Sequence, residues 1–317
     1  MMETPSPLRY PGGKTALTPF LAELISAQSM PRLTAYAEPY AGGAGAALSL
    51  LRRGVVEQIF INDLDPRVAT FWSHAVASTA DLIAKTLSTP VSIDTWHAQR
   101  AIYLDPSAEG SLDLAYAVLF LNRTNRSGIL NARPIGGLNQ DGNWKIDARF
   151  SVPRIVEKLV EVGRLADRIS VSQLEALDFL AGLDRESTFT YLDPPYIKHG
   201  PGLYMNSLKW ADHMELAKYL RDGPRSWLLS YDHDPRVPEV LYRGLRCAEF
   251  AIKHTASSQQ RVGDEYALFS PGLRVKSLSK LGSRGGEWVR SRSRLEEFLD
   301  LERLVSHQRE VTQQLPA

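Results

Sequence analysis

The chain has 317 residues, of which 44% are hydrophobic and 23% charged; this composition is typical of a folded globular protein and excludes a disordered chain. Lys and Arg total 37 against 36 Asp and Glu, so the overall charge indicates no class of partner. The one cysteine, Cys247, excludes an intramolecular disulfide framework and a cysteine-based zinc site. No apolar run approaches the roughly 20 residues of a bilayer span, and the N-terminus lacks the apolar core of a signal peptide. We therefore expect no membrane association and a reducing compartment.

Helix and strand patterns alternate along much of the chain. Apolar residues at helical spacing predict a helix over about 15–27, and 33–38 has the pattern of a strand. A glycine-rich turn, a helix that ends near Gly54 and a second strand at 56–61 follow. Four more short apolar strands are predicted at 169–172, 188–192, 227–231 and 266–270. Strands that alternate with helices predict a largely parallel sheet covered on both faces.

The stretch from about 71 to 150 breaks this alternation. It is mainly helical and then rich in loops, which predicts an inserted second domain. Two segments of the chain are locally basic: 121–154 has six Lys and Arg against two acids, and 272–294 has seven against one. Such segments favour surfaces that face a polyanion, with solvated loops as the alternative. Gly282–Gly286 predicts a flexible joint before a C-terminal amphipathic helix.

A glycine-rich turn, Ala37-Glu38-Pro39-Tyr40-Ala41-Gly42-Gly43-Ala44-Gly45, connects the first strand to a helix. Nucleotide-like ligands lie across strand ends at such turns, where glycine lets the backbone come close. The pattern is not G-x-G-x-x-G and has no basic residue to hold a pyrophosphate, so a dinucleotide is disfavoured. Asp63 follows the second strand, where a carboxylate can accept hydrogen bonds from ribose hydroxyls. A turn or a helix cap is the alternative for Asp63.

The segment Asp193-Pro194-Pro195-Tyr196 comes directly after a predicted strand. Two consecutive prolines fix the chain and donate no amide hydrogens, so the proline carbonyls and the Asp193 carboxylate form a rigid set of acceptors. An aromatic ring follows at once. This arrangement suits a planar ligand that carries an amino group, with a purely structural turn as the alternative.

Four motifs in this order resemble those of the Dam-like DNA adenine methyltransferases: Arg9-Tyr10-Pro11-Gly12-Gly13-Lys14, Glu38-Pro39-Tyr40-Ala41-Gly42-Gly43, Asp63 and Asp193-Pro194-Pro195-Tyr196. The resemblance extends from about Leu8 to Ser270. It implies an α/β fold, a Rossmann-like methyltransferase open sheet with an inserted, mainly helical DNA-recognition domain. The implied division is a discontinuous catalytic domain that binds S-adenosylmethionine (1–70 and 151–275), an inserted target-recognition domain (71–150), and a basic linker with a C-terminal helix (276–317).

The resemblance also implies roles for individual residues. The residues implied to bind S-adenosylmethionine are Tyr10, Lys14, Glu38, Pro39, Tyr40, Gly42, Asp63 and Asp193, with Asp63 at the ribose. The implied catalytic residues are Asp193, Pro194, Pro195 and Tyr196, and Leu228–His233 would flank the target base. Leu121–Gly128 resembles the start of the DNA-contacting insertion. The candidate DNA contacts are Arg123, Arg126, Asn131 and Arg133, with a solvated loop as the alternative for each.

One position departs from the family pattern: Ala44 stands where the family usually has a glycine, and the glycine is displaced to Gly45. Arg123 and Arg126 follow an apolar helical run and are expected to project from the helix end or the loop after it. We expect Cys247 to be a core or strand residue. Histidines are scattered along the chain, so no metal site is expected.

The implied activity is transfer of a methyl group from S-adenosylmethionine to the N6 amino group of adenine in double-stranded DNA. The base must leave the duplex stack, and hydrogen bonds from its amino group to Asp193 and the Pro194 carbonyl would direct the nitrogen lone pair for direct in-line transfer.

Other interpretations stay open on the sequence. One is a methyltransferase that acts on RNA or on the N4 amino group of cytosine; another is a catalytically inactive DNA-binding relative. A protein glutamine methyltransferase is disfavoured because it more often has Asn at the position of Asp193. The resemblance implies a cytoplasmic protein encoded by a prokaryote or phage. It leaves open a cognate restriction endonuclease that acts separately, the recognised DNA sequence and the oligomeric state.

Overall fold

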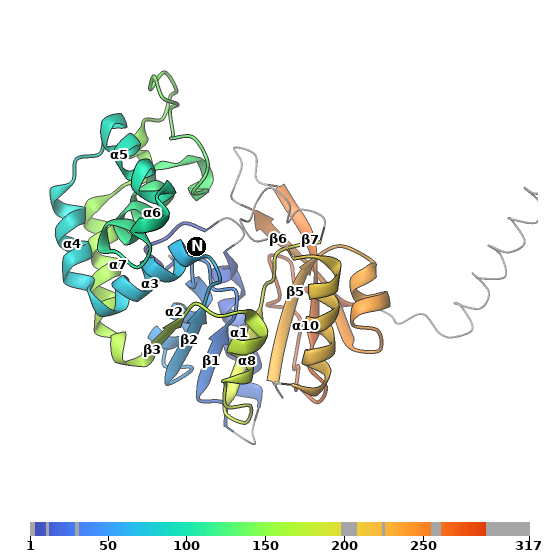
Figure 1. Cartoon of the computed structure of the whole chain (residues 1–317). Helices are drawn as coiled ribbons and strands as arrows, with labels where there is room; N and C mark the ends of the chain where they lie inside the picture. The colour runs from blue at the N-terminus through green and yellow to red at the C-terminus, as the bar shows by residue number, and fades with distance from the viewer. Residues whose placement is uncertain are drawn as a thin grey trace, which may run out of the picture.

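A computed structural model describes residues 4–10, 13–28, 32–197, 208–223, 226–254 and 261–289. Within these residues an open sheet of eight strands has the order β3-β2-β1-β4-β5-β7-β6-β8 (Figure 1). The strands are β1 (Ala35–Glu38), β2 (Gln58–Asn62), β3 (Ile169–Ser172), β4 (Thr188–Leu192), β5 (Ser226–Asp232), β6 (Arg246–His254), β7 (Arg261–Phe269) and β8 (Gly286–Trp288). The first five are parallel, and β7, β6 and β8 pair antiparallel. The predicted α/β open sheet is confirmed.

The helices connect and flank these strands. They are α1 (Thr18–Ala27), α2 (Gly45–Arg52), α3 (Pro66–Ala77), α4 (Thr79–Ser88), α5 (Ile93–Leu104), α6 (Leu112–Thr124), α7 (Val152–Arg164), α8 (Ala176–Ala181) and α10 (Trp210–Asp222). A 3₁₀ turn, η1 (Lys14–Leu17), precedes α1. None of the helices in the described residues is long and apolar enough to cross a bilayer.

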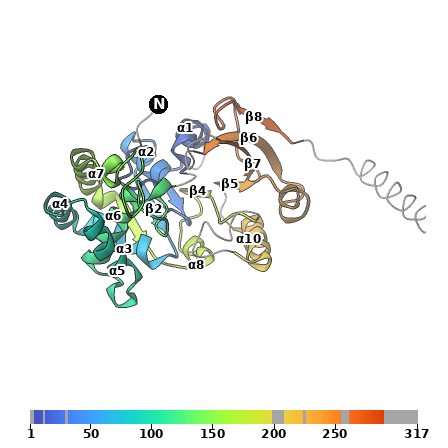
Figure 2. The same ribbon diagram turned by 90° about the horizontal axis from the view of Figure 1, so that it is seen from above.

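Side chains of each strand alternate between two apolar cores, because successive residues of a strand point to opposite faces. Tyr36, Phe189 and Leu228 belong to the core shared with α1 and α2. The neighbouring Ala37 and Leu229 belong to the core shared with α8 and α10. Both faces of the sheet are thus covered, as the view from above shows (Figure 2). The predicted coverage on both faces is confirmed.

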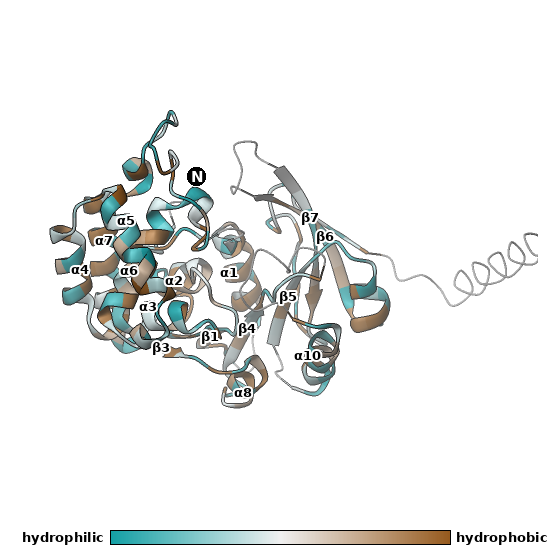
Figure 3. Cartoon of the chain, turned by 45° about the horizontal axis from the view of Figure 1, so that its top comes forward, coloured by the Kyte–Doolittle hydropathy of each residue, from teal (hydrophilic) through white to brown (hydrophobic). Residues whose placement is uncertain are grey.

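Helices α3 to α7 gather beside the β3 edge of the sheet (Figures 1 and 2). Most are amphipathic, with polar and apolar surfaces alternating around the helix (Figure 3). Helix α6 differs because it is buried from Leu114 to its end and contacts α3, α4 and α5. Its apolar side chains join the same core as α1 and α2. The inserted domain was predicted to span residues 71–150. Residue 71 lies inside α3 and residue 150 lies just before α7. The division into domains stays a prediction.

The strand predictions differ from the structure mainly in the last third of the chain. Residues 169–172 and 188–192 form strands with the predicted limits. Strands β6 and β8 were not predicted, and the predicted joint 282–286 leads directly into β8, which pairs with β6. Cys247 is buried in β6, as expected. The predicted C-terminal helix lies outside the described residues.

Candidate active site

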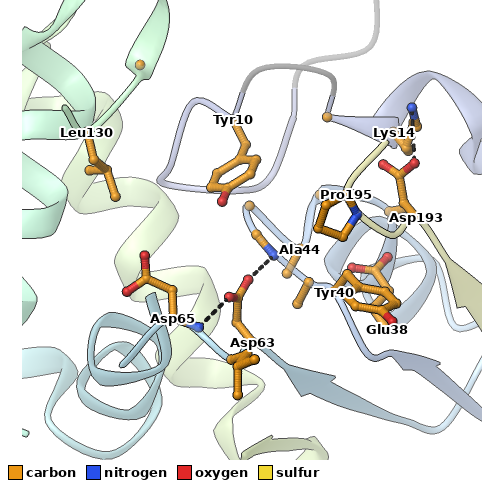
Figure 4. Close-up of a pocket in the computed structure, with 18 of the residues that line it drawn as sticks. Tyr10, Lys14, Glu38, Tyr40, Ala44, Asp63, Asp65, Leu130, Asp193 and Pro195 are labelled. Atoms are coloured by element: carbon orange, nitrogen blue, oxygen red, sulfur yellow. Dashed lines mark hydrogen bonds and ion pairs between the residues drawn. The ribbon is translucent and has the colours of Figure 1, made fainter. Parts of the chain in front are cut away.

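A pocket opens where the strand order reverses, at the carboxyl ends of the adjacent strands β1 and β4 (Figure 4). Ligands of open α/β sheets bind at this kind of position. The pocket brings together residues of all four sequence motifs. The predicted site residues that line it are Tyr10, Lys14, Glu38, Tyr40, Gly42, Asp63, Asp193, Pro195 and Asn131.

The glycine turn after β1 is held by Asp63 from the end of β2. The Gly42 N–H donates to Asp63 Oδ2 at 2.9 Å, and the Asp65 N–H donates to the other oxygen at 3.0 Å. Trp72 Nε1 donates to the Gly42 carbonyl at 2.8 Å. Burial raises the pKa of Asp63 to about 6, although the hydrogen bonds from the Gly42 and Asp65 N–H groups lower it. Asp63 therefore shapes the turn as well as lining the pocket.

Tyr10 explains why residue 42 is a glycine. Gly42 has a φ of +46°, a conformation that favours glycine. A Cβ added there would lie 2.6 Å from Cε1 of the Tyr10 ring. The ring therefore lies directly against the turn backbone, and the turn and the N-terminal segment form one side of the pocket (Figure 4).

Ala44 keeps the turn geometry at the position where the family pattern has glycine. Its φ of 45° and ψ of 30° are left-handed, and it stands immediately before α2. A left-handed alanine costs roughly 1–2 kcal/mol. Its buried methyl group packs in the main core, which offsets part of that cost. The substitution is thus accommodated without loss of the turn.

Glu38 is the buried acid at the end of β1. It accepts hydrogen bonds from Tyr36 Oη at 2.9 Å and from the Ala47 N–H of α2 at 3.2 Å. Burial raises the pKa of Glu38 to about 8, although both hydrogen bonds lower it. Burial therefore favours the protonated form of this carboxyl.

Asp193 follows β4 and belongs to a buried polar network. Ser230 Oγ of β5 donates to Asp193 Oδ1 at 2.7 Å, and Lys14 Nζ lies 3.4 Å from the same oxygen. Tyr196 Oη is also 3.4 Å from Oδ1. Burial raises the pKa of Asp193 to about 6; the charge of Lys14 opposes this rise and the charge of Glu265 adds to it. The charge of Lys14 therefore favours the ionised carboxylate, against the effect of burial.

A family model for D12 class N6 adenine-specific DNA methyltransferases matches residues 10–254. The chain belongs to this family. It is accordingly an S-adenosylmethionine-dependent enzyme that methylates adenine N6 in DNA. No curated protein matches the chain. Among solved structures it is similar to the rRNA methyltransferase AviRa from Streptomyces viridochromogenes, with 16% identity and a TM-score of 0.32 over 79% of this chain and 83% of that one.

Three predicted site residues of this methyltransferase, Pro39, Pro194 and Tyr196, are not among the described residues that line the pocket. Pro39 is buried, and its carbonyl accepts a hydrogen bond from Asn62 at 3.0 Å. Pro194 is also buried. The Tyr196 hydroxyl contacts Lys14 Nζ at 2.6 Å and donates to Glu265 at 2.6 Å. The hydroxyl of Tyr196 is therefore engaged in the buried network of the enzyme.

The candidate DNA contacts are divided between surface and interior. Arg126, Asn131 and Arg133 are exposed, and Asn131 also lines the pocket. Arg123 was expected to project, but this was wrong: it is only 8% exposed. The reason is that α6 is buried around its whole circumference at this end. Burial and the charges of three other arginines lower the pKa of Arg123 to about 10.

Sequence reasoning missed the second carboxylate of the network, Glu265 on β7. It is 1% exposed, and both of its oxygens accept hydrogen bonds from Lys14, at 2.9 and 3.0 Å. The only signal was an acid next to an otherwise apolar predicted strand. Ser230 was included in the segment Leu228–His233 but was not singled out. Within the described residues, no group of three or more His, Cys, Asp or Glu side chains could hold a metal ion.

Proposed function

We propose that this pocket binds S-adenosylmethionine and that Asp193-Pro194-Pro195-Tyr196 receives the target adenine. When bound, this cofactor supplies an electrophilic methyl group on a sulfonium sulfur. The residues present fit such a ligand. The turn at Gly42 offers backbone without a side chain, Tyr10 and Tyr40 offer aromatic rings, and Asp63 offers acceptor oxygens for ribose hydroxyls.

The hydrogen bonding of Asp193 is the observation that carries the catalytic part of the proposal. Every hydrogen bond and ion pair recorded for its carboxylate within the described residues uses Oδ1, from Ser230, Lys14 and Tyr196. Oδ2 therefore stays available as an acceptor, and Asp193 lines the pocket. An adenine amino group that donates there and to the Pro194 carbonyl would have its lone pair directed at the methyl group. Fixed acceptors of this kind act by positioning and by electrostatic stabilisation, and no covalent enzyme intermediate is needed.

An adenine inside a duplex cannot reach Asp193, so the proposal includes base flipping. Extrusion costs a few kcal/mol of stacking and pairing, which contacts in the pocket and along the DNA backbone must offset. A base stacked on an aromatic side chain gains roughly 1–3 kcal/mol. The candidates for this stacking are the rings of Tyr40, which lines the pocket, and Tyr196, which directly follows Pro195 in the motif.

Basic residues around α6 support double-stranded DNA as the partner. Four arginines influence one another electrostatically: Arg9, Arg123, Arg149 and Arg154. Arg9 Nη1 and Arg123 Nε are buried and have no hydrogen-bond partner among the described residues. Like charges gathered in one place favour a polyanion such as the DNA backbone. With Arg126, Asn131 and Arg133 exposed nearby in the chain, we propose this region as the DNA-recognition surface.

The substitution Asp193→Ala tests the catalytic assignment. It should lower methyl transfer to adenine in duplex DNA by at least about a hundredfold, the size expected for loss of a positioned electrostatic contact. Asp167→Asn, at an exposed carboxylate before β3, is the matched control and should keep wild-type activity. The measurement is labelled methyl transfer followed by mass spectrometry of the nucleosides. Near-normal turnover of Asp193→Ala would reject the assignment.

The same assay separates the alternative acceptors. Label in RNA, or in N4-methylcytosine, would identify a different amino substrate for the same pocket. Cofactor binding by calorimetry without transfer to any nucleic acid would favour an inactive relative. The retained turn geometry at Ala44 argues against the inactive alternative, because that departure was its only support in the sequence.

A further inference from the structure

Among the described residues, Lys14 and the carboxylates of Asp193 and Glu265 form a polar cluster at the pocket. Lys14 is 6% exposed and Glu265 is 1% exposed. Lys14 Nζ lies 2.9 and 3.0 Å from the two oxygens of Glu265, but 3.4 Å from Asp193. Because Coulomb attraction increases as charges approach, Lys14 pairs more strongly with Glu265 than with Asp193. With +1 for Lys14 and −1 for each of the two carboxylates, the formal charges of these groups sum to −1.

Glu265 is not among the described residues that line the pocket, whereas Asp193 and Lys14 are. It stands on β7, an antiparallel strand that pairs with β5, and its partner in the register is Asp232. Its Oε1 also accepts a hydrogen bond from Tyr196 at 2.6 Å. Glu265 thus binds two residues of the site motifs, Lys14 and Tyr196, although it does not itself line the pocket.

We infer that Glu265 is a positioning residue that offsets the charge of Lys14, so that the pair of carboxylates leaves a net negative charge beside the pocket for a cationic cofactor. This inference rests on the proposed cofactor site. A cluster charge of −1 matches a sulfonium cation, and it gives no such attraction to S-adenosylhomocysteine, whose sulfur is neutral. The site would therefore prefer the substrate cofactor over the product cofactor. Without Glu265, the positive charge of Lys14 would cancel the negative charge of Asp193.

The electrostatics of Asp193 agree with this division of roles. The charge of Lys14 lowers the pKa of Asp193, and the charge of Glu265 raises it. The hydrogen bond from Ser230 holds Asp193 Oδ1 independently of Lys14. Loss of the Glu265 charge should therefore change the charge facing the ligand more than it changes the position of Asp193.

The test is the ratio of the Kd values for S-adenosylhomocysteine and S-adenosylmethionine, measured by calorimetry on the full chain without DNA. Glu265→Gln should lower the preference for S-adenosylmethionine at least about tenfold, the change expected for one charge within about 12 Å at an effective dielectric constant of about 20. Glu249→Gln removes an exposed acid from the neighbouring strand and should leave the ratio unchanged. The double variant Lys14→Met with Glu265→Gln restores a cluster charge of −1. It should recover the wild-type ratio, even if both ligands bind more weakly.

The possible results are distinguishable. If Glu265→Gln weakens both ligands equally, Glu265 is only structural and the inference is overturned. If the single variant does not fold, the double variant decides, because loss of the preference there would overturn the inference as well. If the wild-type chain binds neither ligand, the proposed cofactor site itself fails, which is a different outcome from an unchanged ratio.

Discussion

The side chain of Asn122 holds the backbone of Arg9 at both of its hydrogen-bonding groups. Asn122 Oδ1 accepts the Arg9 N–H at 2.6 Å, and Nδ2 donates to the Arg9 carbonyl at 2.8 Å. Nδ2 also donates to the Gly128 carbonyl at 2.9 Å. Helix α6, in the region proposed to bind DNA, is thereby attached to the segment that carries Tyr10. The two proposed binding surfaces share this connection.

Substitution of Asn122 should therefore weaken cofactor binding from a distance. Asn122→Ala removes three hydrogen bonds, and the Gly128 carbonyl, which is buried, loses this partner at a cost of roughly 1–3 kcal/mol. Tyr10 loses its anchor, so we expect the affinity for S-adenosylmethionine to fall about tenfold and the unfolding temperature to fall with it. Calorimetry and thermal denaturation measure the two effects. Asn139→Ala, at an exposed asparagine of the same region, is the control. An unchanged affinity in Asn122→Ala would show that Tyr10 is positioned without α6.

The close approach of Tyr10 to Gly42 gives a second prediction, with a matched control at Gly54. Both glycines have positive φ, +46° and +66°, so alanine is strained at either position. A Cβ at Gly54 meets nothing within 4 Å, whereas a Cβ at Gly42 meets the Tyr10 ring. We expect Gly54→Ala to lose about 1 kcal/mol of stability and Gly42→Ala to lose more, because its Cβ also displaces the Tyr10 ring. Only Gly42→Ala should also weaken cofactor binding strongly. Equal cofactor affinities in the two variants would contradict the proposed role of the Tyr10 contact.

The convergence of Glu38, Asp63 and Asp193 was predictable because Glu38 ends a strand and the other two directly follow strands of the same parallel sheet, and such strand ends meet at one edge. The limits of β3 and β4 were predictable from short apolar runs. Glu265 was not, because nothing in the sequence pairs β7 with β5. The burial of Arg123 was not predictable either, because α6 is apolar on all sides over most of its length and so gives no periodic signal of a buried face.

The exposed arginines beyond α6 give a prediction on DNA binding. If Arg126 contacts a phosphate, Arg126→Ala should weaken binding to all duplex sequences alike and reduce the slope of log K against log salt concentration by about 1. Arg185→Ala removes an exposed arginine before β4, at the end of the sheet away from the pocket, and should leave the slope unchanged. Titrations at several salt concentrations measure both. A loss confined to one base position would instead indicate direct base recognition by Arg126.

The raised pKa of Glu38 predicts how stability depends on pH. Burial raises this pKa to about 8 from an ordinary 4.5, so the folded chain holds the proton more tightly than the unfolded chain. The resulting stability is fully present below about pH 4.5 and is lost as the pH rises through 8. Each pKa unit corresponds to about 1.4 kcal/mol, so the wild-type chain should lose up to about 3 kcal/mol from this group between pH 6 and pH 9.

Glu38→Gln keeps a carbonyl oxygen for the hydrogen bonds from Tyr36 and Ala47 but has no proton to lose. Its free energy of unfolding should therefore fall less than that of the wild-type chain over the same pH interval. The carboxyl of Asp63, with a pKa of about 6, titrates in both proteins, and the charge of Asp193 is itself one of the causes that raise the pKa of Glu38, so the difference between the two proteins reports on the ionisation of Glu38. Urea unfolding of both proteins at pH 6 and pH 9 gives the four free energies of unfolding that this comparison requires. Parallel pH dependence in the two proteins would mean that Glu38 ionises without cost, contrary to its burial beside the pocket.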